Sequence, residues 1–115
     1  RLAYCDGYFL DDATLDWFCD KYLPEPADRL DWRASPLLAG RFDDLPPAVL
    51  ITAGCDPLTD DCKAYASALE SAGVPVTLHE FDGMVHGFFT LGKLFRQSAE
   101  AVELAGKALE AALTR

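Results

Sequence analysis

An almost continuous apolar run, Ala48–Ala53, constrains most strongly what this chain can fold into. The run contains β-branched residues and is bounded by Pro47 and Gly54. Runs of this kind are typical of strands that are buried on both faces, as in the centre of a parallel sheet. A second predicted strand covers residues 75–81, and the sequence predicts no third one.

Three helices are predicted around the two strands. The first covers residues 11–22, the second about 58–72 and the third about 93–113. Each has apolar residues at intervals of three or four positions, so one face of each helix is expected to be buried. The expected faces consist of Leu15, Phe18, Cys19 and Tyr22, of Cys62, Tyr65, Leu69 and Ala72, and of Phe95, Ala99, Val102, Ala105, Leu109 and Leu113. Residues 23–46, rich in Pro and Asp, are expected to form a loop.

The order strand, helix, strand, helix predicts two parallel strands joined by a right-handed crossover. Two strands alone cannot cover both faces of Ala48–Ala53 or pair both edges of that strand. The sequence also begins with Arg1, and its single methionine is Met84. We therefore expect an α/β fold that is incomplete as a standalone sheet and forms the C-terminal part of a larger domain.

The composition argues against several classes of function. The 115 residues include 19 Asp+Glu and 10 Lys+Arg, which gives a formal net charge of −9. Binding to a phosphate backbone instead needs clustered Lys and Arg. No apolar run approaches the roughly 20 residues needed to cross a bilayer, and the first residues carry no signal-peptide pattern. We expect a cytoplasmic protein with no nucleic-acid partner and no membrane span.

The four cysteines, Cys5, Cys19, Cys55 and Cys62, form no C-x-x-C pair. Zinc ribbons and thioredoxin-type redox sites therefore lack their main signal. The cysteines are expected to be reduced thiols, several of them buried. A metal site built from two cysteines and both histidines would match no common ligand spacing, so neither a metal nor a cofactor is expected.

Candidate reactive groups follow both predicted strands. Asp56 comes soon after the first strand, and His86 lies in the loop after the second, between Gly83 and Gly87. The carboxyl ends of parallel strands meet at one edge of a sheet, so we expect these two side chains to be neighbours. An Asp beside a His holds one ring nitrogen, and the other nitrogen can then move a proton between a nucleophile and a leaving group.

Each of these residues also has a simpler interpretation. An Asp before a helix is most often an N-cap, and a His between glycines is most often a turn residue. His79 serves as a comparison because it lies inside the second predicted strand, where a packing or surface role is expected. Position and periodicity alone leave the catalytic interpretation of Asp56 and His86 open.

Four segments, in this order along the chain, resemble the C-terminal part of the hormone-sensitive-lipase family of α/β-hydrolase esterases. They are Ala34–Leu37, Leu45–Ala48, Cys55–Asp61 and Gly83–Phe89. Upstream, residues 7–10 and the helix that carries Trp17 and Phe18 resemble the late part of that family's cap. The resemblance covers essentially the whole chain. One departure is Asp61, where the family usually has Glu, and this position concerns helix capping more than chemistry.

The resemblance implies that Asp56 is the acid of a catalytic triad, that His86 is its general base and acid, and that Asp60 is a structural acid. It places residues 1–33 in a cap or lid and residues 34–115 in the C-terminal part of the catalytic domain. The substrate-binding residues that it implies, near an acyl or alcohol pocket, are Trp17, Phe18, Val85 and Phe88. Plain core packing is the alternative for the aromatic side chains among these.

The nucleophile of such an enzyme is missing from the sequence. The motif Gly-x-Ser-x-Gly is absent, and so is the glycine-rich oxyanion motif that begins His-Gly-Gly. In this fold both motifs precede the acid and the histidine, so we expect them in an N-terminal part that this sequence lacks. The expected partners are that N-terminal part, a small-molecule ester and a second copy of the chain. The family often forms homodimers through its last strand and helix.

The leading hypothesis is the C-terminal segment of a serine carboxylesterase that acts on esters of short or medium acyl chains and is inactive by itself. A peptidase of the prolyl-oligopeptidase kind, which ends with similar acid and histidine loops, is one alternative. A non-catalytic binding protein on a hydrolase scaffold is another. A further alternative is a segment that folds only by pairing its exposed edges with another copy or with the missing half.

Overall fold

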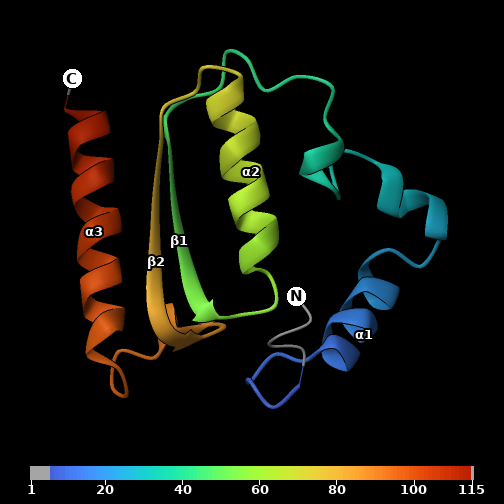
Figure 1. Cartoon of the computed structure of the whole chain (residues 1–115), viewed down its shortest axis with the longest axis horizontal. Coiled ribbons are helices and arrows are strands. Elements are labelled where there is room, and N and C mark those ends of the chain that lie inside the picture. Colours follow the sequence, from blue (N-terminus) through green and yellow to red (C-terminus); the bar gives the residue numbers. More distant parts are fainter. Residues whose placement is uncertain (1–5, 115) are drawn as a thin grey trace.

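The computed structural model describes residues 6–114 of the protein. In chain order its main elements are α1 (Asp12–Tyr22), β1 (Ala48–Cys55), α2 (Thr59–Ser71), β2 (Val76–Val85) and α3 (Arg96–Leu113). The two strands pair in parallel, as their order with α2 predicted. In Figure 1, α2 and α3 lie on opposite sides of the strand pair, and α1 lies beyond α2. The architecture is therefore a layered α/β arrangement built around β1 and β2.

Three short 3-10 helices complete the described elements. η2 (Pro26–Leu30) and η3 (Pro36–Leu38) lie in the segment that leads to β1, and η4 (Phe88–Thr90) follows β2. A proline opens both η2 and η3, where its missing N–H costs no helical hydrogen bond. The predicted loop before β1 thus contains two short 3-10 helices. Within it, the Ser35 hydroxyl donates a 2.7 Å hydrogen bond to the carbonyl of Arg29.

The pairing of the strands explains where β2 ends. The parallel register runs without a break over Ala48–Ala53 and Val76–Phe81. Beyond it β2 bulges, because Asp82–Met84 stand opposite the single residue Gly54 before pairing resumes at Val85. The strand therefore continues past its predicted end at residue 81. Bulges bend a strand and redirect the side chains that follow, so this one shapes the loop after β2.

Burial along β1 confirms in part the expectation of a strand covered on both faces. Thr52 and Ala53 are consecutive, so they point to opposite faces of the sheet, and both are buried. Val49 on β1 is 40% exposed and Leu78 on β2 is 37% exposed. Within the described residues the sheet consists of these two strands alone, and its apolar surface is accordingly only partly covered.

The core lies between the strands and α3. Its buried cluster comprises Ala53, Met84, Phe88 and Ala101, and the side chains of Ile51, Phe81 and Phe95 pack against it. On α3 the small residues Ser98 and Ala101 are 1% and 0% exposed, with Ser98 bonded to Phe88 of η4 and Ala101 packed with Ala53 and Met84 of the strands. A small side chain lets a helix approach a sheet closely, and this decides which face of α3 is buried.

The predicted helix faces are accordingly only partly correct. On α2, Leu69 is buried and the other members of its expected face are half-buried, as predicted. On α3 the expected face is wrong along most of its length, because Ala99 is exposed and Val102, Leu109 and Leu113 are 50%, 63% and 81% exposed. On α1 no residue is buried, and Phe18 and Tyr22 are 54% and 76% exposed. Periodicity finds the apolar stripe of a helix, but only a packed neighbour covers it.

Helix α1 is stabilised locally at its first turn. Asp11 accepts a 2.7 Å hydrogen bond from the backbone N–H of Thr14. Hydrogen bonding to the side chain of Thr14, and then to this N–H, lowers the pKa of the Asp11 carboxyl. Ionised carboxylates are favourable at this end of a helix because they meet unpaired N–H groups and the positive end of the dipole.

Among residues 6–114, no helix is both long enough and apolar enough to span a bilayer.

Candidate active site

The structure brings Asp56 and His86 together. Asp56 follows β1 and His86 follows β2, and the parallel pairing places both at the same edge of the sheet. The Oδ2 atom of Asp56 lies 2.8 Å from Nδ1 of His86, although 30 residues separate them in the chain. The adjacency expected from the strand order is therefore present in the fold, and it forms a carboxylate–imidazole pair.

Asp56 is held by its own loop as well as by the imidazole. Its Oδ1 accepts a 2.9 Å hydrogen bond from the backbone N–H of Leu58, and its side chain is only 12% exposed. The simpler interpretation of Asp56 as an N-cap is not met, because the N-cap of α2 is Leu58 and no side chain caps this helix. One oxygen of Asp56 instead holds the turn before α2, and the other faces His86.

The histidine is presented by a tight turn. Gly83 and Gly87, which bracket it, have φ angles of +71° and +75°, a region in which side chains other than glycine are strained. The buried Phe88 anchors the end of this turn in the core. The His86 side chain remains 41% exposed, so its ring stays accessible to other groups. His79, by contrast, is an exposed residue within β2, which agrees with the surface role expected for it.

Two buried hydroxyl groups lie beside these loops, and sequence reasoning missed both. Thr59 donates a 2.6 Å hydrogen bond to the carbonyl of Ala53, and Ser98 donates one of 2.5 Å to the carbonyl of Phe88. Both donors are buried. The sequence offered one weak signal, for Ser98 only. This serine stands three positions before Ala101, so the two small residues share one face of the last helix.

The residues expected to bind substrate lie in two different settings. Trp17 and Phe18 are more than half exposed on α1 and pack edge to face, with ring centroids 5.2 Å apart. Val85 is half-buried and immediately precedes His86. Phe88 is only 4% exposed and packs on Phe81, so core packing, the alternative stated for it, describes its position here.

The segment before α1 reaches the histidine turn. A Cβ atom placed on Gly87 would lie 4.0 Å from Cε1 of Phe9. Phe9 is 76% exposed and has a φ of +65°, an uncommon conformation for a bulky residue. The aromatic ring of Phe9 therefore lies next to the turn that carries His86.

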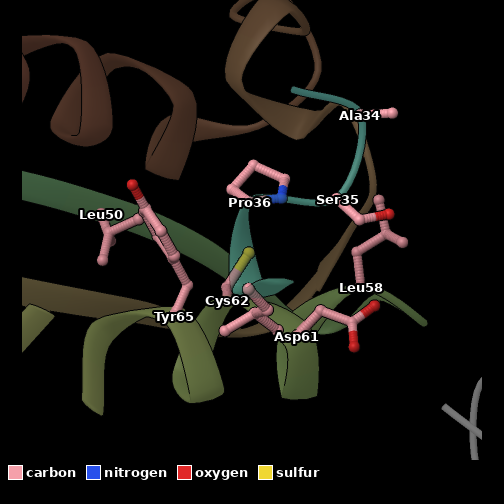
Figure 2. Close-up of a pocket in the computed structure, with 9 residues that line it drawn as sticks. Ala34, Ser35, Pro36, Leu50, Leu58, Asp61, Cys62 and Tyr65 are labelled. Atoms are coloured by element: carbon pink, nitrogen blue, oxygen red, sulfur yellow. The ribbon is translucent and has the colours of Figure 1, made fainter. Parts of the chain in front are cut away.

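A pocket of about 520 Å³ lies between η3 and α2, on the side of the acid loop. Figure 2 shows Ser35 and Pro36 on one side of it and Asp61, Cys62 and Tyr65 of α2 on the other. Leu58 lines it too, whereas Asp56 and His86 are not among its lining residues. The pocket therefore adjoins the acid loop without containing the carboxylate–imidazole pair.

Cys62 brings a thiol to that pocket, and its surroundings favour the protonated form of this thiol. Partial burial, together with the negative charges of Asp56 and Asp61, raises the pKa of the Cys62 thiol. A thiol attacks electrophiles as the thiolate, so Cys62 is a poor nucleophile at neutral pH. Cys19, Cys55 and Cys62 are all free and half-buried rather than buried, while Cys5 lies outside the described residues.

Three of the four serine hydroxyls are bound to the backbone. The hydroxyls of Ser35, Ser71 and Ser98 each donate to a backbone carbonyl. Ser67 is exposed on α2. Asp60, expected to be a structural acid, lies in the first turn of α2, where a carboxylate meets the positive end of the helix dipole.

In the described part of the chain, no group of three or more His, Cys, Asp or Glu side chains is arranged to hold a metal ion. The cysteine and histidine residues considered at the sequence level are therefore not gathered into such a group. What the edge of the sheet does hold is a carboxylate and an imidazole in direct contact. Such a pair can accept a proton from a nucleophile and return it to a leaving group.

Comparison with other proteins places this geometry in a family. The sequence matches the α/β hydrolase fold family over residues 1–90. An ethyl acetate hydrolase from Pseudomonas putida is 42% identical over 107 residues, which are 93% of this chain and 34% of the relative. The human hormone-sensitive lipase is 38% identical over 82 residues, which are 70% of this chain and 8% of the lipase.

Solved structures show the same similarity in three dimensions. An ester hydrolase from the metagenome of Lake Arreo, solved in complex with a bipyridine phosphonate derivative, has a TM-score of 0.93 and 43% identity. The match covers 100% of this chain and 36% of that structure. A hyperthermophilic esterase from the archaeon Pyrobaculum calidifontis has a TM-score of 0.93 at 31% identity, with 100% and 38% covered.

These relatives and structures also agree in how much of their length the chain matches. The chain spans about a third of the length of the bacterial relative and of the two solved structures. The matched region contains both strands, the acid loop and the histidine loop. The chain is a partial hydrolase domain, and it belongs to the hormone-sensitive-lipase family of α/β-hydrolase esterases.

Proposed function

We propose that this chain is the C-terminal part of a serine carboxylesterase in which Asp56 and His86 are the acid and the base of a catalytic triad. The observation that carries the proposal is the 2.8 Å contact between their side chains, at the carboxyl ends of two neighbouring parallel strands. In open α/β sheets this edge is where reacting groups gather.

In the proposed mechanism Asp56 holds Nδ1 of His86 and leaves Nε2 as the proton acceptor. Nε2 takes the proton of a serine hydroxyl supplied by another segment of the protein, and the serine oxygen forms a bond to the ester carbonyl carbon. The carboxylate stabilises the imidazolium. When the intermediate collapses, the carbon–oxygen bond to the alcohol breaks and the imidazolium gives its proton to the leaving alkoxide.

The second half of the reaction returns the site to its starting state. A water molecule gives a proton to His86 and its oxygen attacks the acyl-serine carbonyl. The bond to the serine oxygen then breaks, and the imidazolium returns the proton to that oxygen, which releases a carboxylic acid. Among the described serines, Ser35, Ser71 and Ser98 use their hydroxyls elsewhere, so the proposal places the nucleophile and the oxyanion donors outside this sequence.

The partner of this segment is accordingly the N-terminal part of the same hydrolase domain. β1 pairs on one side with β2, and the described residues place no strand against its other side. The relatives are about three times as long as this chain, so they have room for further strands. A strand from that part would pair with the open edge of β1.

The substrates that we propose are small esters with short or medium acyl chains. The relatives named above are ester hydrolases and a lipase, which supports ester rather than peptide hydrolysis. Residues 1–33 would form part of a cap and residues 34–115 the end of the catalytic domain. Trp17, Phe18 and Val85 would then line the substrate's path. A cytoplasmic location and a homodimer also remain proposals.

The test is a kinetic comparison in the full-length protein. With p-nitrophenyl acetate and butyrate, we expect His86→Ala to lower kcat by at least a factor of about 10³, because the proton acceptor is removed. His79→Ala is the matched control, since His79 is exposed on β2 away from the carboxylate, and it should keep the activity. Near-normal ester hydrolysis by His86→Ala would refute the proposal, and cleavage of peptides but not esters would point to the peptidase alternative.

A further inference from the structure

We propose that the buried hydroxyls of Thr59 and Ser98 are positioning groups for the Asp56–His86 pair, one for each loop. The inference rests on the proposed function, because it gives these hydroxyls a purpose only if the pair must keep its geometry during turnover. It names two residues that neither touch the reacting atoms nor belong to the triad.

Thr59 closes the loop that carries the acid. It is the first residue of α2 and is 7% exposed, and its hydroxyl donates a 2.6 Å hydrogen bond to the carbonyl of Ala53 in β1. The backbone N–H of Thr59 also donates to the carbonyl of Asp56, at 3.2 Å. The acid therefore lies in a short loop whose two ends are tied together inside the protein.

Ser98 anchors the loop that carries the base. It lies in the first turn of α3, is 1% exposed, and its hydroxyl donates a 2.5 Å hydrogen bond to the carbonyl of Phe88. Phe88 follows His86 by two positions and is itself buried. The bond thus joins the histidine turn to α3 at the point where that turn enters the core.

Both bonds end on the same body of packed residues. Ala53 and Phe88, whose carbonyls accept the two bonds, belong to one buried cluster with Ala101, which follows Ser98 by one helical turn. Protein cores are close-packed and do not deform continuously. The separation of the acid and the base is therefore set by a rigid core to which both loops are tied, and much less by the loops themselves.

A purely packing role does not explain why these two side chains are hydroxyls. Burying a hydroxyl is unfavourable unless it is hydrogen-bonded, and serine is a weaker helix former than alanine. An alanine would fill nearly the same space as Ser98, and a valine the same space as Thr59. What alanine and valine cannot provide is a directional bond to a chosen backbone carbonyl.

The experiment removes each hydroxyl with little change in shape, in the full-length protein. We expect Thr59→Val and Ser98→Ala to lower kcat on p-nitrophenyl butyrate by about 10- to 100-fold, while KM stays within about twofold, because small displacements of catalytic groups cost this much. Thr59→Ser keeps a hydroxyl and should restore kcat to within about threefold. Ser71→Ala is the matched control, since the Ser71 hydroxyl makes the same kind of bond to the carbonyl of Ser67 on the surface of α2.

A second measurement needs no turnover. In mildly acidic buffer the proton on Nδ1 of His86, bonded to Asp56, gives a low-field NMR resonance that should be sharp in the wild type. It should broaden or vanish in Thr59→Val and Ser98→Ala and persist in Thr59→Ser and Ser71→Ala. Thermal unfolding identifies any variant that fails to fold, and Ser98→Cys then replaces Ser98→Ala because a thiol is a weak donor of similar size.

The outcomes separate the two proposals. If Thr59→Val and Ser98→Ala keep both kcat and the resonance, the positioning role is wrong, whatever the function of the protein. If Thr59→Ser loses as much as Thr59→Val, the residue acts by packing and the inference also fails. If the wild type hydrolyses no ester but the resonance follows the expected series, the positioning role stands and the proposed esterase function falls.

Discussion

Gly54 in β1 lies against the backbone of Asp82 in β2. A Cβ atom built on Gly54 would lie 3.1 Å from the Cα of Asp82 and 3.3 Å from the backbone nitrogen of Gly83. These are atoms of the bulge in β2 that stands opposite Gly54 in the strand pairing. The bulge redirects the chain toward His86, so a residue without a side chain on β1 is what allows the histidine loop to approach the acid loop.

We expect Gly54→Ala to disturb both stability and activity. The added methyl group meets backbone rather than a flexible side chain, so the bulge must shift, which costs about 1–3 kcal/mol in the free energy of unfolding. The same shift moves His86 away from Asp56 and should lower kcat. Gly40→Ala is the control, because no heavy atom lies within 4 Å of the Cβ it would add. Denaturant unfolding and ester kinetics check both, and equal behaviour of the two variants would contradict the prediction.

Replacement of Asp56 by Asn should abolish activity while the fold survives. The Asn carbonyl can still accept from the N–H of Leu58, so the free energy of unfolding should change by less than about 1 kcal/mol. The Asn amide would donate to Nδ1 of His86 and stabilise the wrong tautomer, with a loss in kcat on the order of 10⁴. Asp44→Asn, at an exposed position, should leave kcat unchanged. A modest loss in Asp56→Asn would show that Asp56 is a capping residue only.

The Cys62 thiol should react slowly at neutral pH and faster in alkaline buffer. Its pKa is raised by partial burial and by the carboxylates of Asp56 and Asp61, so little thiolate is present near pH 7. Mass spectrometry of iodoacetamide labelling at about pH 7 and pH 10 tests this prediction. The Asp56→Asn variant removes one of the two negative charges and should label faster. Labelling of Cys62 that is rapid at neutral pH, or insensitive to Asp56→Asn, would contradict the prediction.

The same pKa shift predicts how stability depends on pH. The folded state holds the Cys62 proton more tightly than the unfolded state does, so its contribution is complete below the unfolded pKa of about 8.5. As pH rises above that value the unfolded chain releases the proton first, and the free energy of unfolding should fall. Cys62→Ala should show a weaker decline over the same range. Urea unfolding at several alkaline pH values measures both curves, and parallel curves would rule out this contribution.

The 115-residue chain by itself should hydrolyse p-nitrophenyl esters no faster than free imidazole does. It holds the proposed acid and base, but the hydroxyls of Ser35, Ser71 and Ser98 bond to backbone carbonyls. The same chain with His86→Ala provides the baseline. Saturable hydrolysis that the His86→Ala change removes would place a nucleophile within these residues and overturn our assignment of it to another segment.

The strand order and the adjacency of Asp56 and His86 were predictable because both follow from periodicity and from the geometry of parallel sheets. An apolar run between Pro47 and Gly54 allows few alternatives to a buried strand. Once two strands are parallel, the residues beyond their carboxyl ends lie at the same edge, whatever the details of packing. The resemblance to the esterase family added the proposed roles of these residues, and the matches confirm the family itself.

The faces of the helices were less predictable. Periodicity favoured Leu109 and Leu113 as buried residues of the last helix, but Ser98 and Ala101 are buried instead. Large apolar side chains are favoured inside on average, yet a helix that approaches a sheet closely needs small ones at the contact. The stripe on α1 that includes Phe18 is exposed for a related reason, since no pattern within a helix states which element will cover it.

The sequence by itself determined the order of the elements, the parallel strands and the edge where Asp56 and His86 meet, because these depend on local periodicity and chain connectivity. Only the tertiary structure decided the bulge over Gly54 and the two hydroxyl bonds to Ala53 and Phe88. Those features depend on contacts between residues distant in the chain, whose energies are set by packing. The distance between the acid and the base is such a feature, and the packed core sets it.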